Sequence, residues 1–121
     1  MFHILVAEDD RELRELFCHV LSENGYEAIP AENGAKALEL LDQTHIDLII
    51  SDIMMPKIDG IELTIALRDA RYELPILMIT AKNGMVDKQK GFQAGVDDYM
   101  IKPVDVNEML WRVAALLRRA Q

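Results

Sequence analysis

The sequence lacks a second cysteine, since Cys18 is the only one among its 121 residues. A single thiol excludes an internal disulfide and a thiolate metal cluster, and it fits a protein of the reducing cytoplasm. No apolar run approaches the roughly 20 residues that a membrane-spanning helix needs, and the first residues lack the basic segment of a signal peptide. We therefore expect a cytoplasmic domain that has no contact with a membrane.

Positive charge is also scarce, because 13 Lys and Arg residues stand against 21 Asp and Glu residues. The net charge of −8 argues against direct binding to nucleic acid, which needs a basic face. It suits a partner that is a cation or a basic protein. Half of the residues are apolar and no linker or repeat interrupts them, so the chain is expected to form one ordered domain.

Apolar runs typical of buried strands alternate with helical patterns along the chain. The strand candidates are residues 3–7, 27–31, 48–51, 76–79 and 98–101. A helix candidate follows each strand. Asp10 and Asp105 are placed to cap the first and last helices, and Asn24 is placed to end the first. Turn signals at Asn33 and Asp59 introduce the second and third helices. This alternation predicts an α/β fold, a doubly wound parallel sheet of order 2-1-3-4-5 with five helices, as in flavodoxin.

Two strands that this order makes neighbours end in carboxylates. Glu8 and Asp9 follow the first strand, and Asp52 follows the third, at the edge where ligands bind in such sheets. Thr80 and Lys102 follow the fourth and fifth strands at the same edge. Three carboxylates and one ammonium leave a charge of about −2, which one divalent cation balances. Oxygen ligands favour Mg²⁺ or Mn²⁺, and an arriving phosphoryl group could be attacked by the Asp52 carboxylate.

Four motifs, in this order, resemble the receiver domain of two-component response regulators. They are ILVAEDD at 4–10, DIMMP at 52–56 with Asp59 and Gly60, ITA at 79–81, and DDY at 97–99 followed by Lys102 and Pro103. Each motif alone is weak, but all four in order and at compatible spacing are very specific, and the similarity covers the whole chain. The resemblance implies that Asp52 accepts a phosphoryl group from the phosphohistidine of a sensor histidine kinase.

The same resemblance implies a magnesium site. Asp9, Asp52 and the backbone carbonyl of Met54 would bind Mg²⁺ directly, and Glu8 would act on the metal largely through water. The side chains of Met54 and Lys82 would flank the path of the water that hydrolyses the phosphorylated state.

The resemblance further implies a switch. Lys102, whose peptide bond to Pro103 is expected to be cis, would pair with a phosphoryl oxygen, Thr80 would move toward the phosphoryl group, and Tyr99 would swing inward behind it. The fourth helix, at about 84–94, has few apolar anchors beyond Met85, Val86 and Phe92. A weakly anchored helix has the low local stability of a switching segment, so we expect phosphorylation to act on it.

Within the family, the chain is most similar to regulators that carry a winged-helix DNA-binding domain after the receiver. In that subfamily, phosphorylation promotes a symmetric dimer through the face formed by the fourth helix, fifth strand and fifth helix. Carried over by position, the intermolecular ion pairs would be Lys88 with Glu108, Asp98 with Arg112, and Asp97 with Arg119. An ordinary solvated face with ion pairs inside one chain is the alternative. We expect residues 1–121 to be the N-terminal part of a longer transcription regulator, although a stand-alone receiver stays open.

Three other functions remain to be distinguished. An aspartyl-phosphate phosphatase or phosphotransferase acting on outside substrates commonly needs a second Asp where Met54 stands. A flavodoxin-like redox module needs a phosphate-binding loop where Glu8, Asp9 and Asp10 would repel a phosphate. A static receiver is disfavoured because every expected site residue is present. We therefore predict a signalling switch that promotes its own phosphorylation and dephosphorylation rather than a dedicated enzyme.

Overall fold

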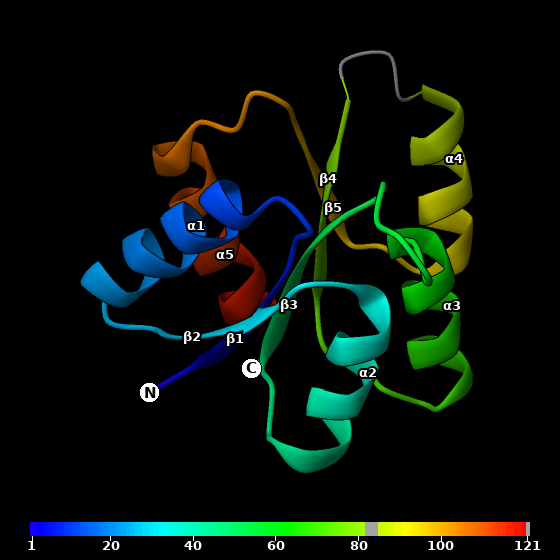
Figure 1. Cartoon of the computed structure of the whole chain (residues 1–121), viewed down its shortest axis with the longest axis horizontal. Helices are drawn as coiled ribbons and strands as arrows, with labels where there is room; N and C mark the ends of the chain where they lie inside the picture. The colour runs from blue at the N-terminus through cyan, green and yellow to red at the C-terminus, as the bar shows by residue number, and fades with distance from the viewer. Residues whose placement is uncertain (82–84, 121) are drawn as a thin grey trace.

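One sheet of parallel strands forms the centre of the protein (Figure 1). The computed structural model describes residues 1–81 and 85–120, without the side chains of 85–87. The strands are β1 (His3–Ala7), β2 (Glu27–Ala31), β3 (Leu48–Asp52), β4 (Ile76–Thr80) and β5 (Asp98–Ile101). Their order, β2-β1-β3-β4-β5, confirms the predicted topology. Lys82 and Gly84 lie outside the described residues, as do the side chains of Met85 and Val86.

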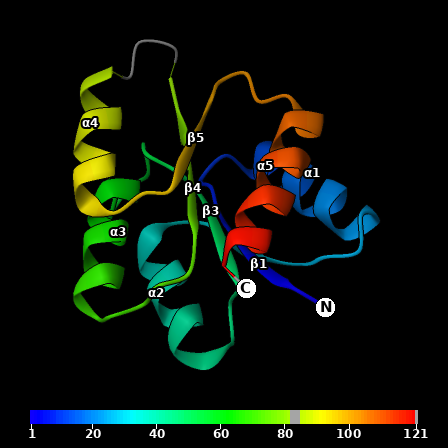
Figure 2. The same ribbon diagram turned by 180° about the vertical axis from the view of Figure 1, so that it is seen from behind.

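Helices cover both faces of this sheet. They are α1 (Arg11–Glu23), α2 (Gly34–Gln43), α3 (Gly60–Asp69), α4 (Met85–Ala94) and α5 (Val106–Arg119). Figures 1 and 2 show α1 and α5 together on one face and α2, α3 and α4 on the other. Among the described residues, no helix has the length and apolar character needed to cross a membrane.

Side chains along each strand alternate between two apolar layers. Ile4 of β1 packs in the layer of Phe17 and Val113, under α1 and α5. Leu5, the next residue, packs in the opposite layer with Leu63 of α3. Because both faces of the sheet are buried, the strand sequences are continuous apolar runs and do not alternate between apolar and polar residues. Burying one large side chain contributes about 1.5–3 kcal/mol, so the two layers together hold the helices against the sheet.

Capping side chains fix the helix starts next to the strand ends. Asp10 accepts hydrogen bonds from the backbone of Glu12 and Leu13, and Asn33, Asp59 and Asp105 cap α2, α3 and α5 in the same way. The caps of α1 and α5 confirm the sequence prediction, and α2 and α3 begin at the turn signals predicted to introduce them, where Asn33 and Asp59 act as caps. Each cap contributes about 1 kcal/mol, because it supplies an acceptor for backbone amides of the first turn.

The order of the strands reverses between β1 and β3. These two strands pair in register from Ile4 with Leu48 to Ala7 with Ser51. The next residues along the chain, Glu8 and Asp52, therefore lie beside each other, Glu8 just after β1 and Asp52 as the last residue of β3. This is the topological switch point at which doubly wound sheets bind ligands.

Candidate functional site

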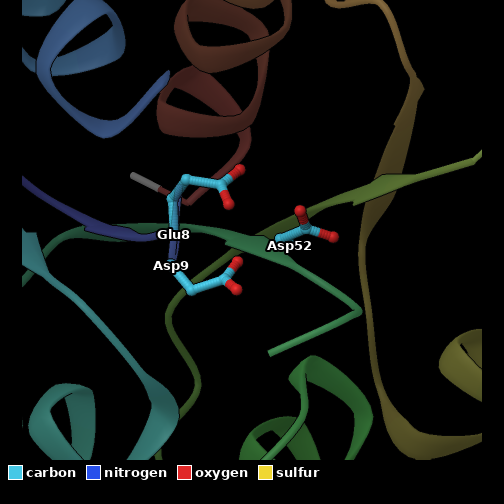
Figure 3. A group of neighbouring side chains, drawn as sticks. All are labelled: Glu8, Asp9 and Asp52. Carbon is cyan, nitrogen blue, oxygen red and sulfur yellow. The ribbon is translucent and has the colours of Figure 1, made fainter. Parts of the chain in front are cut away.

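An acid cluster, formed by Glu8, Asp9 and Asp52, lies at the switch point. One carboxylate oxygen from each of the three residues lies within 4.8 Å of the others. Figure 3 shows the side chains of Glu8 and Asp9 reaching from the end of β1 toward the side on which Asp52 lies. The structure therefore brings together the three carboxylates that the strand order predicted.

Two members of the cluster are removed from water. Glu8 is 1% exposed and Asp52 is 3% exposed. The Glu8 Oε2 atom accepts a hydrogen bond from the Asp10 amide at 3.1 Å, whereas Oε1 is buried and has no hydrogen-bond partner among the described residues. Burial, and to a smaller extent the charge of Asp52, raise the pKa of Glu8 to about 7. An unpartnered buried carboxylate oxygen is costly, so the site is incomplete without a cation, water or proton.

The carboxylate of Asp52 is held on both sides. The Lys102 ammonium donates a hydrogen bond to Oδ2, and the Met54 amide donates to Oδ1 at 3.1 Å. Burial alone would lower the pKa of Lys102, but its hydrogen bond to Asp52 and the charges of the acid cluster raise the pKa instead. The Lys102–Pro103 peptide bond is cis, as expected from the resemblance. Lys102 therefore remains charged beside the acids.

Thr80 lies at the end of β4, one strand away from Asp52. The register pairs Asp52 with Ile79, so Thr80 stands one position beyond the end of that pairing. Its side chain is buried, and the hydroxyl makes a long contact of 3.5 Å to the carbonyl of Ala81. This weak contact leaves the hydroxyl free to rotate toward a new acceptor at the strand ends.

Tyr99 of β5 lies in the inward position. Its side chain is 7% exposed, and its hydroxyl donates a hydrogen bond to the Lys88 carbonyl of α4 at 2.9 Å. The ring meets Phe92 edge to face, with 4.8 Å between the ring centroids. Tyr99 therefore connects β5 to the backbone of α4.

Four of the six residues predicted for intermolecular ion pairs form pairs inside the chain. Arg112 contacts both oxygens of Asp98, at 3.0 and 2.8 Å, and Glu108 at 3.1 Å. Asp97 accepts hydrogen bonds from Arg68 at 3.0 Å and from the Ile76 amide at 2.8 Å. This is the alternative that the sequence analysis left open, and it describes the isolated chain.

The remaining two residues of that set, Lys88 and Arg119, form no ion pair among the residues that the structure describes. Lys88 lies on α4, and Arg119 is the last residue of α5.

Sequence reasoning missed the roles of two residues that shape the site. The Arg14 guanidinium of α1 donates to the Glu8 carbonyl at 2.8 Å and so braces the loop that carries Glu8 and Asp9. Gly60 approaches the end of β3 so closely that a Cβ atom there would lie 2.5 Å from the Asp52 carbonyl oxygen. Gly60 stood in a recognised turn signal, but nothing in the sequence pointed to this close contact or to Arg14.

The fold and the acid cluster together define a class of protein. It is an α/β domain of flavodoxin-like topology whose ligand-binding edge presents carboxylates and one lysine. The sequence matches the family model of the response regulator receiver domain over residues 4–114. The chain therefore belongs to the receiver domain family, the phosphorylation-activated switches of two-component systems, which are not classical enzymes.

Known response regulators are similar to the chain in sequence. Response regulator MprA of Mycobacterium sp. strain KMS is 43% identical over 116 residues, which are 96% of this chain and 50% of that protein. Response regulator MprA of Mycobacterium leprae strain TN is 42% identical over 118 residues, which are 98% of this chain and 52% of that protein. The chain spans about half the length of the curated relatives that it matches.

Solved receiver domains are similar in structure. The receiver domain of the Francisella response regulator 1452 has a TM-score of 0.94 and 33% identity, with 100% of both chains covered. The receiver domain of TorR, the response regulator of a TMAO respiratory system, has a TM-score of 0.94 and 31% identity over 100% of both chains.

Proposed function

We propose that Asp52 accepts a phosphoryl group from the phosphohistidine of a sensor histidine kinase, with a divalent cation bound beside it. The observation that carries this proposal is the setting of Asp52, a buried carboxylate with Lys102 on one oxygen and the Met54 amide on the other. These two donors orient the carboxylate at the open edge of the sheet, and orientation is a large part of what phosphoryl transfer requires.

The acid cluster fits a hard cation such as Mg²⁺ or Mn²⁺. It offers only oxygen donors, and the Glu8 Oε1 atom lacks a partner among the described residues. Asp9, Asp52 and the backbone carbonyl of Met54 would hold the ion, and Glu8 would bind it through water. The bound ion supplies positive charge that offsets the charge of the phosphoryl oxygens.

In the transfer step, an Asp52 oxygen attacks the phosphorus of the phosphohistidine. A P–O bond forms, the P–N bond breaks, and its electron pair leaves on the imidazole nitrogen. Lys102 then exchanges its contact with the carboxylate for one with a phosphoryl oxygen, which carries more charge. Hydrolysis of the resulting acyl phosphate by water resets the switch, so the domain catalyses only its own phosphorylation and dephosphorylation.

The same phosphoryl oxygens provide an acceptor for Thr80. Its hydroxyl exchanges a long contact with the Ala81 carbonyl for a charge-assisted hydrogen bond. This movement favours the inward position of Tyr99 over an outward one. It thereby favours the arrangement of α4 and β5 in which Tyr99 contacts α4. The phosphatase alternative gains no support, because the side chain at its second acid position is Met54, which is 74% exposed.

Labelling with a small phosphodonor tests the assignment. In the presence of Mg²⁺ and acetyl phosphate, we expect an acid-stable, base-labile adduct that is absent in Asp52→Asn. Asp10→Asn is the matched control, since Asn keeps the cap of α1 while removing a neighbouring carboxylate. Labelling of Asp52→Asn equal to that of the native chain would refute the proposal.

We further propose that phosphorylation promotes a symmetric dimer through α4, β5 and α5. Large apolar side chains are exposed on all three elements, namely Phe92, Ile101 and Trp111, the last being 71% exposed. Because Arg112 already contacts Asp98 of its own chain, dimerisation would exchange or share this pair rather than create it. Asp97, Lys88, Glu108 and Arg119 would complete the interface.

A mixture of two variants separates intermolecular from intrachain pairs. Arg112→Glu and Asp98→Arg each give positions 98 and 112 like charges, which repel across a homodimer interface, so neither variant is expected to dimerise alone. An equimolar mixture restores opposite charges only across the interface. Phosphorylation-dependent heterodimers in sedimentation experiments would support the proposal, and their absence would count against it.

We also propose that the chain is the N-terminal half of a transcription regulator that contacts DNA through a second, C-terminal domain and works in the cytoplasm. The support is that the matched relatives named MprA are about twice as long as this chain. The acidic receiver domain itself would not bind DNA.

A further inference from the structure

Helix α4 contains a buried glycine, Gly91, well inside its ten residues. Glycine in the interior of a helix is destabilising relative to alanine, and where it stands there it commonly has a packing reason. The reason in this protein is the ring of Tyr99. A Cβ atom built on Gly91 would lie 1.6 Å from the Tyr99 hydroxyl oxygen and 2.9 Å from its Cζ atom.

The direction of the missing side chain explains this contact. The Cα–Cβ bond of a helical residue tilts toward the N-terminus, so a side chain at 91 would cover the turn that contains residue 88. The Tyr99 hydroxyl occupies this space and donates to the Lys88 carbonyl at 2.9 Å. The phenol can reach the helix backbone only because position 91 has no side chain.

We propose that Gly91 is a positioning residue for the switch: its missing side chain forms the seat in α4 that the inward ring of Tyr99 occupies. This inference rests on the proposed role of Tyr99 in switching. Any side chain at 91 closes the seat, so the inward state is lost even when Asp52 is phosphorylated. Gly91 thereby acts on the output of the switch and not on the phosphoryl transfer.

The position of the Tyr99 ring can be measured without phosphorylation. The chain has three tyrosines, so fluorine NMR of protein labelled with 3-fluorotyrosine gives three resonances, and Tyr99→Phe assigns that of Tyr99. We expect the Tyr99 resonance to be shielded from water in the native chain and exposed in Gly91→Ala. Gln89→Ala, an exposed change in the same helix, is the matched control and should leave the resonance unchanged.

Dimerisation provides the functional readout. With acetyl phosphate and Mg²⁺, Gly91→Ala should be labelled on Asp52 as the native chain is, while its dimerisation weakens by about ten-fold or more. In a Tyr99→Ala background, the same substitution should change dimerisation by less than about two-fold, because no ring remains to be displaced.

The outcomes separate the two proposals. A native chain that is not labelled refutes the proposed function, while the fluorine measurement still decides the role of Gly91. A Tyr99 resonance that stays shielded in Gly91→Ala overturns the inference. If Gly91→Ala does not fold, recovery of folding by adding Tyr99→Ala supports the inference, and failure to recover overturns it.

Discussion

Acidic side chains gather at both edges of the sheet, but their surroundings differ. At the amino-terminal edge, Asp47 accepts hydrogen bonds from the His3 amide at 2.8 Å and contacts the His45 ring at 2.9 Å. Burial would raise the pKa of Asp47, yet these hydrogen bonds lower it overall. At the carboxyl-terminal edge, burial raises the pKa of Glu8 to about 7, and one of its oxygens has no partner among the described residues.

This difference separates a structural carboxylate from a functional one. The amino-terminal edge also pairs His3 with Glu27 at 2.9 Å, so Asp47 and Glu27 each have a donor. In the acid cluster, by contrast, one lysine, Lys102, is the positive charge beside three carboxylates. Such an arrangement persists where a ligand completes it, because perturbed pKa values concentrate at functional sites. The comparison makes opposite predictions for substitutions at the two edges.

The largest effect is expected from Glu8→Gln in the protein without metal at pH 8. The substitution removes a buried charge from the acid cluster, so we expect the free energy of unfolding to rise by up to about 3 kcal/mol. Urea denaturation measures this change. A large loss of stability instead would mean that Glu8 is a satisfied structural acid like Asp47.

The pH dependence of the native chain follows from the same shift. Between the ordinary pKa of 4.5 and the raised pKa of about 7, the unfolded chain has released the Glu8 proton while the folded chain keeps it. The contribution of Glu8 therefore lowers stability as pH rises through this window. Asp47 acts in the opposite sense, since its pKa is lowered below 3.8 and its contribution is lost only in stronger acid. Glu8→Gln should remove the first dependence and leave the second.

Addition of Mg²⁺ is expected to have the next largest effect. At a hundred times its dissociation constant, a ligand that binds only the folded state stabilises it by about 2.7 kcal/mol. We expect this gain for the native chain at pH 8 and a smaller one for Asp9→Asn at the same Mg²⁺ concentration. Thermal unfolding with and without a chelator tests the expectation. An equal gain in both proteins would remove Asp9 from the proposed ligands.

Asp47→Ala tests the amino-terminal edge. It leaves the His3 amide and the His45 ring without their acceptor, and we expect a loss of about 1–3 kcal/mol. Asp42→Ala, an exposed acid on α2, is the matched control. Mg²⁺ binding and labelling by acetyl phosphate should be unchanged in both variants, because Asp47 lies at the edge opposite the acid cluster. A changed Mg²⁺ affinity in Asp47→Ala would show that the two edges are coupled.

The smallest effect is expected from His45→Ala. The ring is largely exposed and its pair with Asp47 is open to solvent, so we expect a loss of about 0–1 kcal/mol. Urea denaturation at pH 6 and pH 8 measures this loss. A loss as large as that of Asp47→Ala would mean that the His45 contact, rather than the backbone of His3, holds the edge together.

Local sequence patterns predicted the elements well. Three strands have the predicted bounds, and β3 and β4 extend one residue further, to Asp52 and Thr80. That extension comes from pairing with neighbouring strands, which a local pattern does not contain. For the same reason the sequence did not reveal that Arg68 binds Asp97, since 29 positions separate the two residues.

The sequence by itself determined the topology and the meeting of Glu8, Asp9 and Asp52, because apolar runs fix the strands and parallel order brings their ends together. Only the tertiary structure decided how these acids are held, that Arg112 pairs within its own chain, and that Gly91 makes room for Tyr99. Desolvation and close contacts depend on distances between segments far apart in the chain, and periodicity carries no information on such distances.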